Sequence, residues 1–512
     1  MLSIRTTFSG TYLSRCGSRA TIMRHISSDR RLLTLTSTTP IRNPCTRHPP
    51  SAAATMSQIT QKAADLETYV SKGGIKVTER FFNVPLDYAN PTGEKIRIFV
   101  RHVIPKSKAK TIDEEGKLPY LLYLQGGPGF EIDQQWTSAF AQEIHEQGYQ
   151  TLWLDQRGTG LSTHISPESL PLRLVTDQDK ADYLRHFRAD SIVKDCEEIR
   201  KILLGDKPNP EDRKWTVMGQ SFGGFCAITY LSFFPSSLKE VFLTGGLAPL
   251  DENPDRVYAS LISILRKRNE SYYQKYPQDI KRIRDILAYL EANEVELPSG
   301  GRLSVSRWLQ LGIHFGGTGG IDRMHQTVLR VVNDLELFGR LTFKTLQIIQ
   351  SKYSYDGNPI YAILHEPLYC QGHASRWSAA RTIANHAQFS WAHVKKLVDT
   401  EPIYFYGEMI FPDMFDDYVN LRPLKGAAQI LANHSSWGPL YDIEQLRKNE
   451  VKVTAATYFN DMYVEFGIAQ ETASIIKNTE QYITNQLNHD GIGQDAKDVM
   501  KHLFQLSKRE YD

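Results

Sequence analysis

The chain has 512 residues, with 60 basic and 58 acidic side chains, 41% hydrophobic residues and five cysteines. This ordinary globular composition excludes collagen-like, disulfide-framework and wholly disordered proteins. No stretch approaches the roughly 18 uninterrupted apolar residues of a membrane span, and the length fits one or two α/β domains with insertions.

The first 55 residues differ in charge from the rest of the chain. They contain eight arginines, no lysine and one acidic residue, Asp29, so their net charge is +7, whereas the remainder carries −5. An arginine- and serine-rich, acid-poor segment without an apolar core is typical of a mitochondrial transit peptide and not of a secretory signal. The alternative is a disordered leader, or synthesis that begins at Met56. We therefore expect a cytoplasmic or mitochondrial protein that is not secreted.

Cysteine usage also indicates an intracellular protein. Cys196, Cys226 and Cys370 are far apart and show no C-x-x-C or metal-ligand spacing. A sparse, odd set of cysteines is expected where thiols stay reduced. We interpret these three as small buried hydrophobic residues, and we expect neither a metal nor a cofactor.

Beyond about residue 75 the sequence predicts an α/β fold. Two β-branched and aromatic runs, 81–84 and 96–104, flank the turn signal Asn-Pro-Thr-Gly at 90–93, which predicts a hairpin. Short, continuous apolar runs that end in glycines follow, and such runs are typical of parallel strands covered on both faces. These runs are 120–124, 151–154, 215–218 and 241–244.

Helical periodicity replaces this pattern over residues 248–447, with charged outer faces at 256–293 and 324–351. Two strand-like runs, 451–459 and 481–487, follow it. The simplest interpretation is an α/β core, built from residues 75–247 and 448–512, with a large helical cap inserted at 248–447. A glycine-rich stretch within the cap follows no strand and lacks a P-loop lysine, so we do not expect a nucleotide site there.

Residues 219–223 read Gly-Gln-Ser-Phe-Gly, directly after one apolar run and before an apolar helical stretch at 225–234. In this context G-x-S-x-G predicts a sharp strand-to-helix turn that lifts Ser221 above the sheet as a nucleophile. Gly219 and Gly223 are expected because a Cβ at either position would collide with the turn. The helix N-terminus would favour developing negative charge.

A serine nucleophile needs an oxyanion hole, which usually consists of backbone donors. The first donor is expected to be the Phe222 N–H. The second should come from the loop Gln-Gly-Gly-Pro-Gly at 125–129, where Gly127 is the first choice and Gly126 the reserve. Asp155 and Arg157, at the end of another strand, are expected to brace the neighbouring loop instead of binding substrate.

Together these motifs resemble the proline iminopeptidase (prolyl aminopeptidase) family of α/β-hydrolases, in its long, large-capped branch. The segments GGPG, DQRGTGLS and GQSFGG occur in that family's order and spacing, and LHE, GEM, NDMYV and NHDG extend the resemblance from about residue 78 to the C-terminus. Many members have His where this chain has Gln125, which leaves the backbone donors unchanged. The resemblance implies an α/β-hydrolase fold and a serine aminopeptidase that releases N-terminal proline, or another small residue, from short peptides.

The resemblance also implies the catalytic acid and base by position. Asp461 and His489 each follow one of the two late strand-like runs, which gives the order Ser, Asp, His expected in this fold. His434 is the competing base, and Asp413 and Glu465 are the competing acids.

An aminopeptidase must bind a charged amine, and a desolvated ammonium needs a counter-charge. The family's glutamates for this purpose come from the inserted domain, and Glu366 and Glu408 stand at the matching motifs. Ordinary salt bridges or helix caps are the alternative for both. Tyr361, Tyr369 and Trp377 are compatible either with an apolar proline pocket or with a helical core.

Two other functions stay open. The same triad would serve an esterase, amidase or thioesterase that acts on a small metabolite, because the fold does not choose the substrate. A non-catalytic binding protein with a hydrolase fold is an alternative of another class. We expect a short peptide or small acyl substrate and neither nucleic acid nor a membrane as a partner; the oligomeric state is not predicted.

Overall fold

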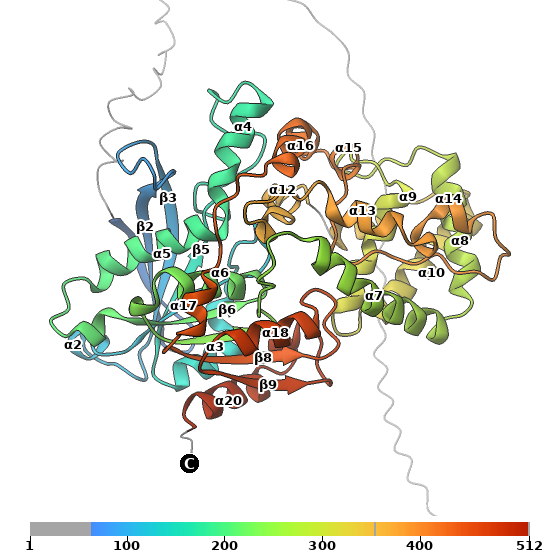
Figure 1. The fold of residues 1–512 in the computed structure, drawn as a ribbon. Coiled ribbons are helices and arrows are strands. Elements are labelled where there is room, and N and C mark those ends of the chain that lie inside the picture. Colours follow the sequence, from blue (N-terminus) through green and yellow to red (C-terminus); the bar gives the residue numbers. More distant parts are fainter. Residues whose placement is uncertain (1–62, 353–354, 510–512) are drawn as a thin grey trace, which may run out of the picture. The chain divides into compact units, whose positions relative to one another are not determined.

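The computed structural model describes residues 63–352 and 355–509, so the predicted leader at residues 1–55 lies outside the described residues. Within these described ranges, nine strands form one sheet in the order β1-β2-β3-β5-β4-β6-β7-β8-β9 (Figure 1). The strands are β1 (Ala63–Ser71), β2 (Ile75–Pro85), β3 (Lys95–Pro105), β4 (Tyr120–Leu124), β5 (Gln150–Asp155), β6 (Trp215–Gln220), β7 (Leu238–Thr244), β8 (Lys452–Tyr458) and β9 (Thr479–Thr484).

Helices connect and cover these strands. Before β7 they are α2 (Ile112–Glu115), α3 (Ala139–Glu146), α4 (Asp177–Leu184), α5 (Ala189–Leu204) and α6 (Phe222–Phe233). Between β7 and β8 they are α7 (Asp255–Lys275), α8 (Asp279–Ala292), α9 (Val305–Leu309), α10 (Gly320–Phe338), α11 (Phe343–Lys352), α12 (Pro359–Leu364), α13 (Ser378–Ala384), α14 (Trp391–Val394), α15 (Met414–Asp417), α16 (Lys425–Asn433) and α17 (Ile443–Arg447). After β8 they are α18 (Phe466–Ile475), α19 (Gly491–Gln494) and α20 (Ala496–Ser507). None of the helices in the described ranges is long and apolar enough to cross a membrane.

Short 3₁₀ helices complete the connections. They are η1 (Gln135–Thr137), η2 (Arg185–Phe187), η3 (Pro210–Arg213), η4 (Pro235–Ser237), η5 (Gln310–Gly316), η6 (Pro367–Tyr369), η7 (Ala387–Phe389) and η8 (Arg422–Leu424).

The pairing of the strands confirms both the hairpin and the parallel sheet predicted from the sequence. Strands β2 and β3 pair antiparallel, and Pro85 lies opposite Lys95 next to the loop that contains the predicted turn. Strand β3 then pairs antiparallel with β5, and β5, β4, β6, β7, β8 and β9 are all parallel to one another. The fold is therefore α/β with a mostly parallel sheet.

Continuous apolar strands reflect a sheet that is covered on both faces. Leu122 and Leu124 of β4 belong to the core that includes α5 and α6, whereas Leu121 and Tyr123 belong to the core that includes α3 and α20. Because successive side chains of a strand point to opposite faces, a strand buried on both sides has no polar alternation. This arrangement explains why the strands were recognised by the length of their apolar runs and by the glycines that follow, and not by an alternation of polar and apolar residues.

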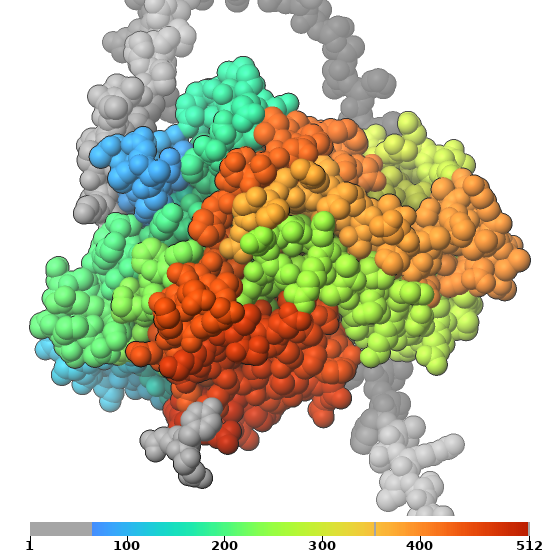
Figure 2. All heavy atoms as spheres, in the orientation of Figure 1, coloured from blue at the N-terminus to red at the C-terminus, as the bar shows by residue number. Residues whose placement is uncertain are grey.

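The described residues between β7 and β8 form helices and one isolated β-bridge, between Glu296 and Arg302. Each of the two long periodic stretches is divided in two. Pro277 follows α7, and Gly339 ends α10 in the left-handed conformation, with φ 63°. Arg256 of α7 forms an ion pair of 2.5 Å with Glu471 of α18, and Figure 2 shows this part of the helical segment lying against the C-terminal part of the chain.

Strand β1 was not predicted, and two other strands differ clearly in their bounds: β2 begins at Ile75, six residues before the predicted run at 81–84, and β9 ends earlier than predicted. Strand β1 was missed because its side chains over residues 64–70 are exposed and alternate little in polarity, as expected for an edge strand that pairs only with β2. Strand β9 ends at Thr484, before the predicted end at residue 487. The Thr484 hydroxyl accepts a hydrogen bond from the Gln486 N–H at 3.2 Å, which turns the chain away from the sheet.

Candidate active site

Ser221 lies at the sharp turn between β6 and α6. Its backbone has φ 54° and ψ −124°, an unusual conformation for a residue with a side chain. The turn is fixed on both sides: the Ser221 N–H donates to the Thr244 carbonyl at 3.0 Å, and the Gly224 N–H donates to the Ser221 carbonyl at 2.7 Å. Helix α6 therefore begins at Phe222, three residues earlier than predicted, with no linker after the serine.

The glycines around Ser221 are required by close backbone approaches, as predicted. A Cβ on Gly219 would come within 2.3 Å of the Gly223 carbonyl oxygen, and one on Gly223 within 2.0 Å of the Leu124 carbonyl oxygen. These distances are far below van der Waals contact, so no side chain fits at either position without moving the backbone.

The glycine loop after β4 lies beside the serine. A Cβ on Gly126 would be 3.1 Å from Ser221 Cβ, and Gly127 has φ 122°, a conformation that favours glycine. Phe222 is the first residue of α6, where backbone N–H groups have no partner within the helix. Gln125 braces this loop, since its side-chain amide donates to the Glu131 carbonyl at 3.3 Å and accepts from Tyr123.

Asp155 and Arg157 brace loops, as predicted. The buried Asp155 carboxylate accepts from the Ile132 N–H at 3.0 Å and from the Leu161 N–H at 2.9 Å. Arg157 forms a fully buried ion pair with Asp195 at 2.5 Å. Neither side chain faces the cavity that contains Ser221.

The structure brings Asp461 and His489 together. His489 Nδ1 lies 2.7 Å from Asp461 Oδ2, and the second carboxylate oxygen accepts from the N–H groups of Tyr463 at 2.8 Å and Val464 at 3.0 Å. Burial disfavours the imidazolium, but the charge and hydrogen bond of Asp461, together with the charges of Glu408 and Asp490, raise the pKa of His489 above its ordinary value. The pair can hold one tautomer and stabilise a protonated ring.

The competing acid and base residues have other contacts. The His434 ring packs edge-on against Trp437, with ring centres 4.8 Å apart. Asp413 precedes α15, and Glu465 caps α18 by accepting from the Ile468 N–H at 2.9 Å. None of the three lines the cavity that contains Ser221.

Ser221 and His489 line one cavity of about 260 Å³ at the C-terminal ends of the parallel strands. Loops of the core and residues of the helical segment share its lining. The lining residues are Gln125, Gly126, Gly127, Phe130, Gln220, Ser221, Ile313, His314, Tyr361, Glu408, Tyr463 and His489.

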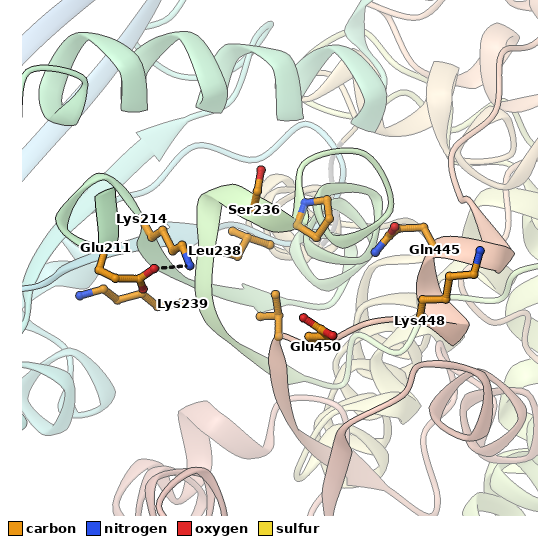
Figure 3. Close-up of a pocket in the computed structure, with 10 residues that line it drawn as sticks. Glu211, Lys214, Ser236, Leu238, Lys239, Gln445, Lys448 and Glu450 are labelled. Atoms are coloured by element: carbon orange, nitrogen blue, oxygen red, sulfur yellow. Dashed lines mark ion pairs between the residues drawn. The ribbon is translucent and has the colours of Figure 1, made fainter. Parts of the chain in front are cut away.

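A larger cavity of about 760 Å³ lies at the opposite, N-terminal ends of β6, β7 and β8 (Figure 3). Its wall includes the ion pair of Lys214 with Glu211 at 2.7 Å, together with Lys239 and Lys448. The whole length of β6, roughly 20 Å, separates it from Ser221. Ligands of open parallel sheets bind at the C-terminal ends of the strands, so the smaller cavity is the candidate active site.

Glu408 lines the cavity that contains Ser221. Its Oε1 accepts a hydrogen bond from the Tyr361 hydroxyl, which fixes the position of the carboxylate. The Tyr361 ring packs edge-on against Phe130, with ring centres 5.3 Å apart, and stacks with His365, with ring centres 5.0 Å apart. The Glu408 carboxyl group therefore lies beside aromatic rings of the cavity wall.

Glu366 lies apart from the cavity lining. It is buried, and its two carboxylate oxygens accept from the N–H groups of Ser378 at 3.1 Å and Ala379 at 2.9 Å. It therefore caps the N-terminus of α13, which is the alternative considered for it in the sequence. Burial raises the pKa of the Glu366 carboxyl to about 6, against the opposing effect of these bonds.

Several lining residues carried little signal in the sequence. Phe130 directly follows the glycine loop, and Tyr463 stands in the NDMYV segment, but neither was assigned a role. Ile313 and His314 precede the glycine-rich stretch of the segment between β7 and β8. Burial, together with the nearby charges of Lys352 and Arg323, lowers the pKa of His314 to about 4. Of the three aromatic residues considered for a proline pocket, Tyr361 lines the cavity, whereas Tyr369 and Trp377 do not.

In residues 63–352 and 355–509, no group of three or more His, Cys, Asp or Glu side chains is placed to hold a metal ion. Cys196, Cys226 and Cys370 are free and buried, as predicted, and burial raises the pKa of each thiol.

A serine on a strand-to-helix turn, followed in the chain by an Asp–His pair on loops after β8 and β9, defines the α/β-hydrolase class. A family model described as alpha/beta hydrolase fold matches residues 119–289, in agreement with this architecture.

Two relatives extend over most of the chain. Proline iminopeptidase aneH of Aspergillus aculeatus is 41% identical over 451 residues, which cover 88% of this chain and 98% of that protein. Proline iminopeptidase of Aeromonas sobria is 39% identical over 436 residues, covering 85% and 97%. The solved structure of the Mycobacterium smegmatis proline iminopeptidase aligns with 13% identity and a TM-score of 0.37, over 83% of this chain and 98% of that one. On the two long alignments, the chain belongs to the proline iminopeptidase family.

Proposed function

We propose that this protein is a serine aminopeptidase that hydrolyses the bond after an N-terminal proline, or another small residue, in short peptides. The observation that carries the proposal is a single cavity that contains Ser221, Glu408 and the His489 of a His–Asp pair. Its relatives at about 40% identity are named as proline iminopeptidases, which supports the same substrate class.

The reaction follows from the hydrogen bonds of His489. Because Nδ1 is bonded to Asp461, Nε2 is the ring nitrogen left to accept the Ser221 hydroxyl proton. The Ser221 Oγ then forms a bond to the scissile carbonyl carbon, and the resulting oxyanion accepts hydrogen bonds from the N–H groups of Phe222 and Gly127, with Gly126 as the reserve donor.

Collapse of this intermediate breaks the carbon–nitrogen bond. His489 gives its proton to the leaving amine, and a prolyl ester of Ser221 remains. A water molecule then takes the place of the serine hydroxyl in a second round of the same steps. His489 accepts a proton from this water, and the water oxygen attacks the ester carbonyl carbon. The Ser221 oxygen then leaves and takes the proton from His489. Asp461 stabilises the imidazolium in both halves of the reaction.

Recognition of the substrate's amine is assigned to Glu408. Its carboxylate provides the counter-charge that an ammonium needs when it leaves water. The Phe130 and Tyr361 rings beside it offer an apolar surface to a pyrrolidine ring. Glu366, whose two oxygens are bonded to the N-terminus of α13, is given no direct role.

We further propose that residues 248–447 act as a cap on the α/β core of 75–247 and 448–512. Ile313, His314 and Glu408 come from this segment and line the cavity together with Ser221. A cavity of about 260 Å³ has room for a few residues of an extended peptide and excludes a folded protein. This size supports short peptides as substrates.

The first test is labelling with a fluorophosphonate, which reacts with activated serines. Wild-type protein should be labelled and Ser221→Ala should not, and a lack of labelling in both would refute the serine hydrolase. His489→Ala should lower kcat by about 10⁴-fold or more, whereas His434→Ala should leave kcat unchanged. The reverse result would move the base to His434.

The second test compares substrates. A panel of aminoacyl-arylamides and simple esters should give the highest kcat/KM with the prolyl-arylamide. Faster turnover of small esters that carry no amine would instead favour the metabolite esterase, and labelling without turnover of any substrate in the panel would refute the aminopeptidase.

A further inference from the structure

The contacts among the lining residues divide the cavity wall into two groups. In the first, Phe130 packs on Tyr361, whose hydroxyl donates to Glu408. A Cβ on Gly127 would be 2.8 Å from the Phe130 ring, so this group adjoins the oxyanion loop.

The second group adjoins His489. The Tyr463 ring stands edge-on to the His489 ring, with ring centres 4.7 Å apart, and its hydroxyl donates to the Ile313 carbonyl. His314 follows directly in the chain and lines the same cavity. This wall therefore combines one residue of the core with two of the helical segment.

The proposed reaction places a different part of the substrate against each of the two groups. The amine of the first substrate residue is held at Glu408, in the first group. The leaving nitrogen must lie within reach of His489, which protonates it, so the rest of the peptide extends along the second group. The side chain of the second substrate residue is thereby placed against Tyr463, Ile313 and His314.

Resting on the proposed function, we infer that Ile313, His314 and Tyr463 form a subsite for an apolar side chain at the second residue of the substrate. Ile313 is an aliphatic residue with 6% of its surface exposed, and the Tyr463 hydroxyl is occupied by the Ile313 carbonyl, which leaves its ring as the contact surface. Because the pKa of His314 is about 4, its ring is uncharged at neutral pH.

This wall is held in place by further bonds to the glycine-rich stretch. Asp490, the residue after His489, accepts from the Thr318 N–H at 3.1 Å and from its hydroxyl at 3.0 Å. Arg268 donates to the Phe315 carbonyl at 2.9 Å. The segment over residues 313–318 is thus fastened to the loop of the catalytic base, so the subsite is formed before substrate binds.

The experiment measures proline release from Pro-Leu-NH₂ and Pro-Asn-NH₂, whose second side chains have nearly the same shape but opposite polarity. Wild type should prefer the leucine amide by about tenfold in kcat/KM. Ile313→Ala should reduce this preference about fivefold, and the milder Ile313→Val about twofold. Phe130→Leu, in the other group, should lower kcat/KM for both amides in the same proportion.

A wild-type preference within twofold of unity would overturn the subsite, as would a preference that Ile313→Ala and Ile313→Val leave unchanged or that Phe130→Leu alters. Release of proline from both amides at equal rates would leave the aminopeptidase standing and refute only the subsite. If proline is released from neither amide, the release of N-terminal proline is refuted, and the subsite with it.

Discussion

Replacement of Glu408 by Gln tests whether the cavity recognises an ammonium. The change keeps the shape of the side chain and an oxygen that can accept from Tyr361, but it removes the negative charge. Two unit charges 4 Å apart attract by about 4 kcal/mol at an effective dielectric constant near 20. Desolvation of both groups offsets part of this attraction, which leaves about 2–3 kcal/mol. We therefore expect kcat/KM for a prolyl-arylamide to fall roughly 30- to 150-fold.

The assay compares this substrate with an aryl ester of cyclopentanecarboxylic acid, which has the ring of proline without its amine. Glu408→Gln should lower kcat/KM for the prolyl substrate and leave the neutral ester within twofold. Tyr361→Phe removes one hydrogen bond to the carboxylate and should cost the prolyl substrate about two- to tenfold. Equal losses on both substrates, or none on the prolyl substrate, would refute recognition of the amine by Glu408.

Three further outcomes follow from contacts in the structure. His489 must be neutral to act as a base, so kcat/KM should rise with pH through its pKa; Asp490→Asn removes one of the charges that raise this pKa, and the acid limb of the pH profile should move to lower pH. Gly223→Ala should destabilise the fold by about 3 kcal/mol in urea unfolding, whereas Gly438→Ala, with no atom within 4 Å of the new Cβ, should change stability little. Glu366→Gln turns an amide donor toward a backbone N–H and should lower the free energy of unfolding by about 1–3 kcal/mol. Its kcat/KM should stay within twofold of wild type. A large rise in KM at unchanged stability would instead restore Glu366 as an amine ligand.

The sheet was largely predictable from the sequence, because the inner parallel strands β4, β5, β6 and β7 contain short apolar runs that are buried on both faces of the sheet. Strand β4 occupies the predicted residues 120–124, and the hairpin of β2 and β3 follows from its turn residues. Strand β1 escaped prediction since an exposed edge strand needs no apolar face. The breaks within the long helical stretches depended on single residues, Pro277 and Gly339, which periodicity alone does not weigh.

The candidate site was predictable where local backbone geometry demands particular residues. Gly219 and Gly223 stand on either side of Ser221 because no Cβ fits at these two positions, so the G-x-S-x-G motif by itself predicts the turn. The contacts of the helical segment could not be predicted from local backbone geometry in this way. Glu366 and Glu408 each stand at a motif that matches the family, yet one caps a helix and the other lines the cavity, and only the tertiary path of the chain distinguishes them.

The residues proposed for the reaction and those proposed for substrate recognition are likewise positioned by different parts of the fold. Ser221 and His489 follow the ends of parallel strands, whereas Ile313 lies in the 3₁₀ helix η5 and Glu408 in a loop of the segment between β7 and β8. The bonds of Tyr463 to Ile313 and of Asp490 to Thr318 join the two parts next to the catalytic base. A substitution that weakens these bonds would therefore displace the wall beside the leaving group before it disturbs Ser221. The resulting loss of kcat/KM should then depend on the leaving group of the substrate.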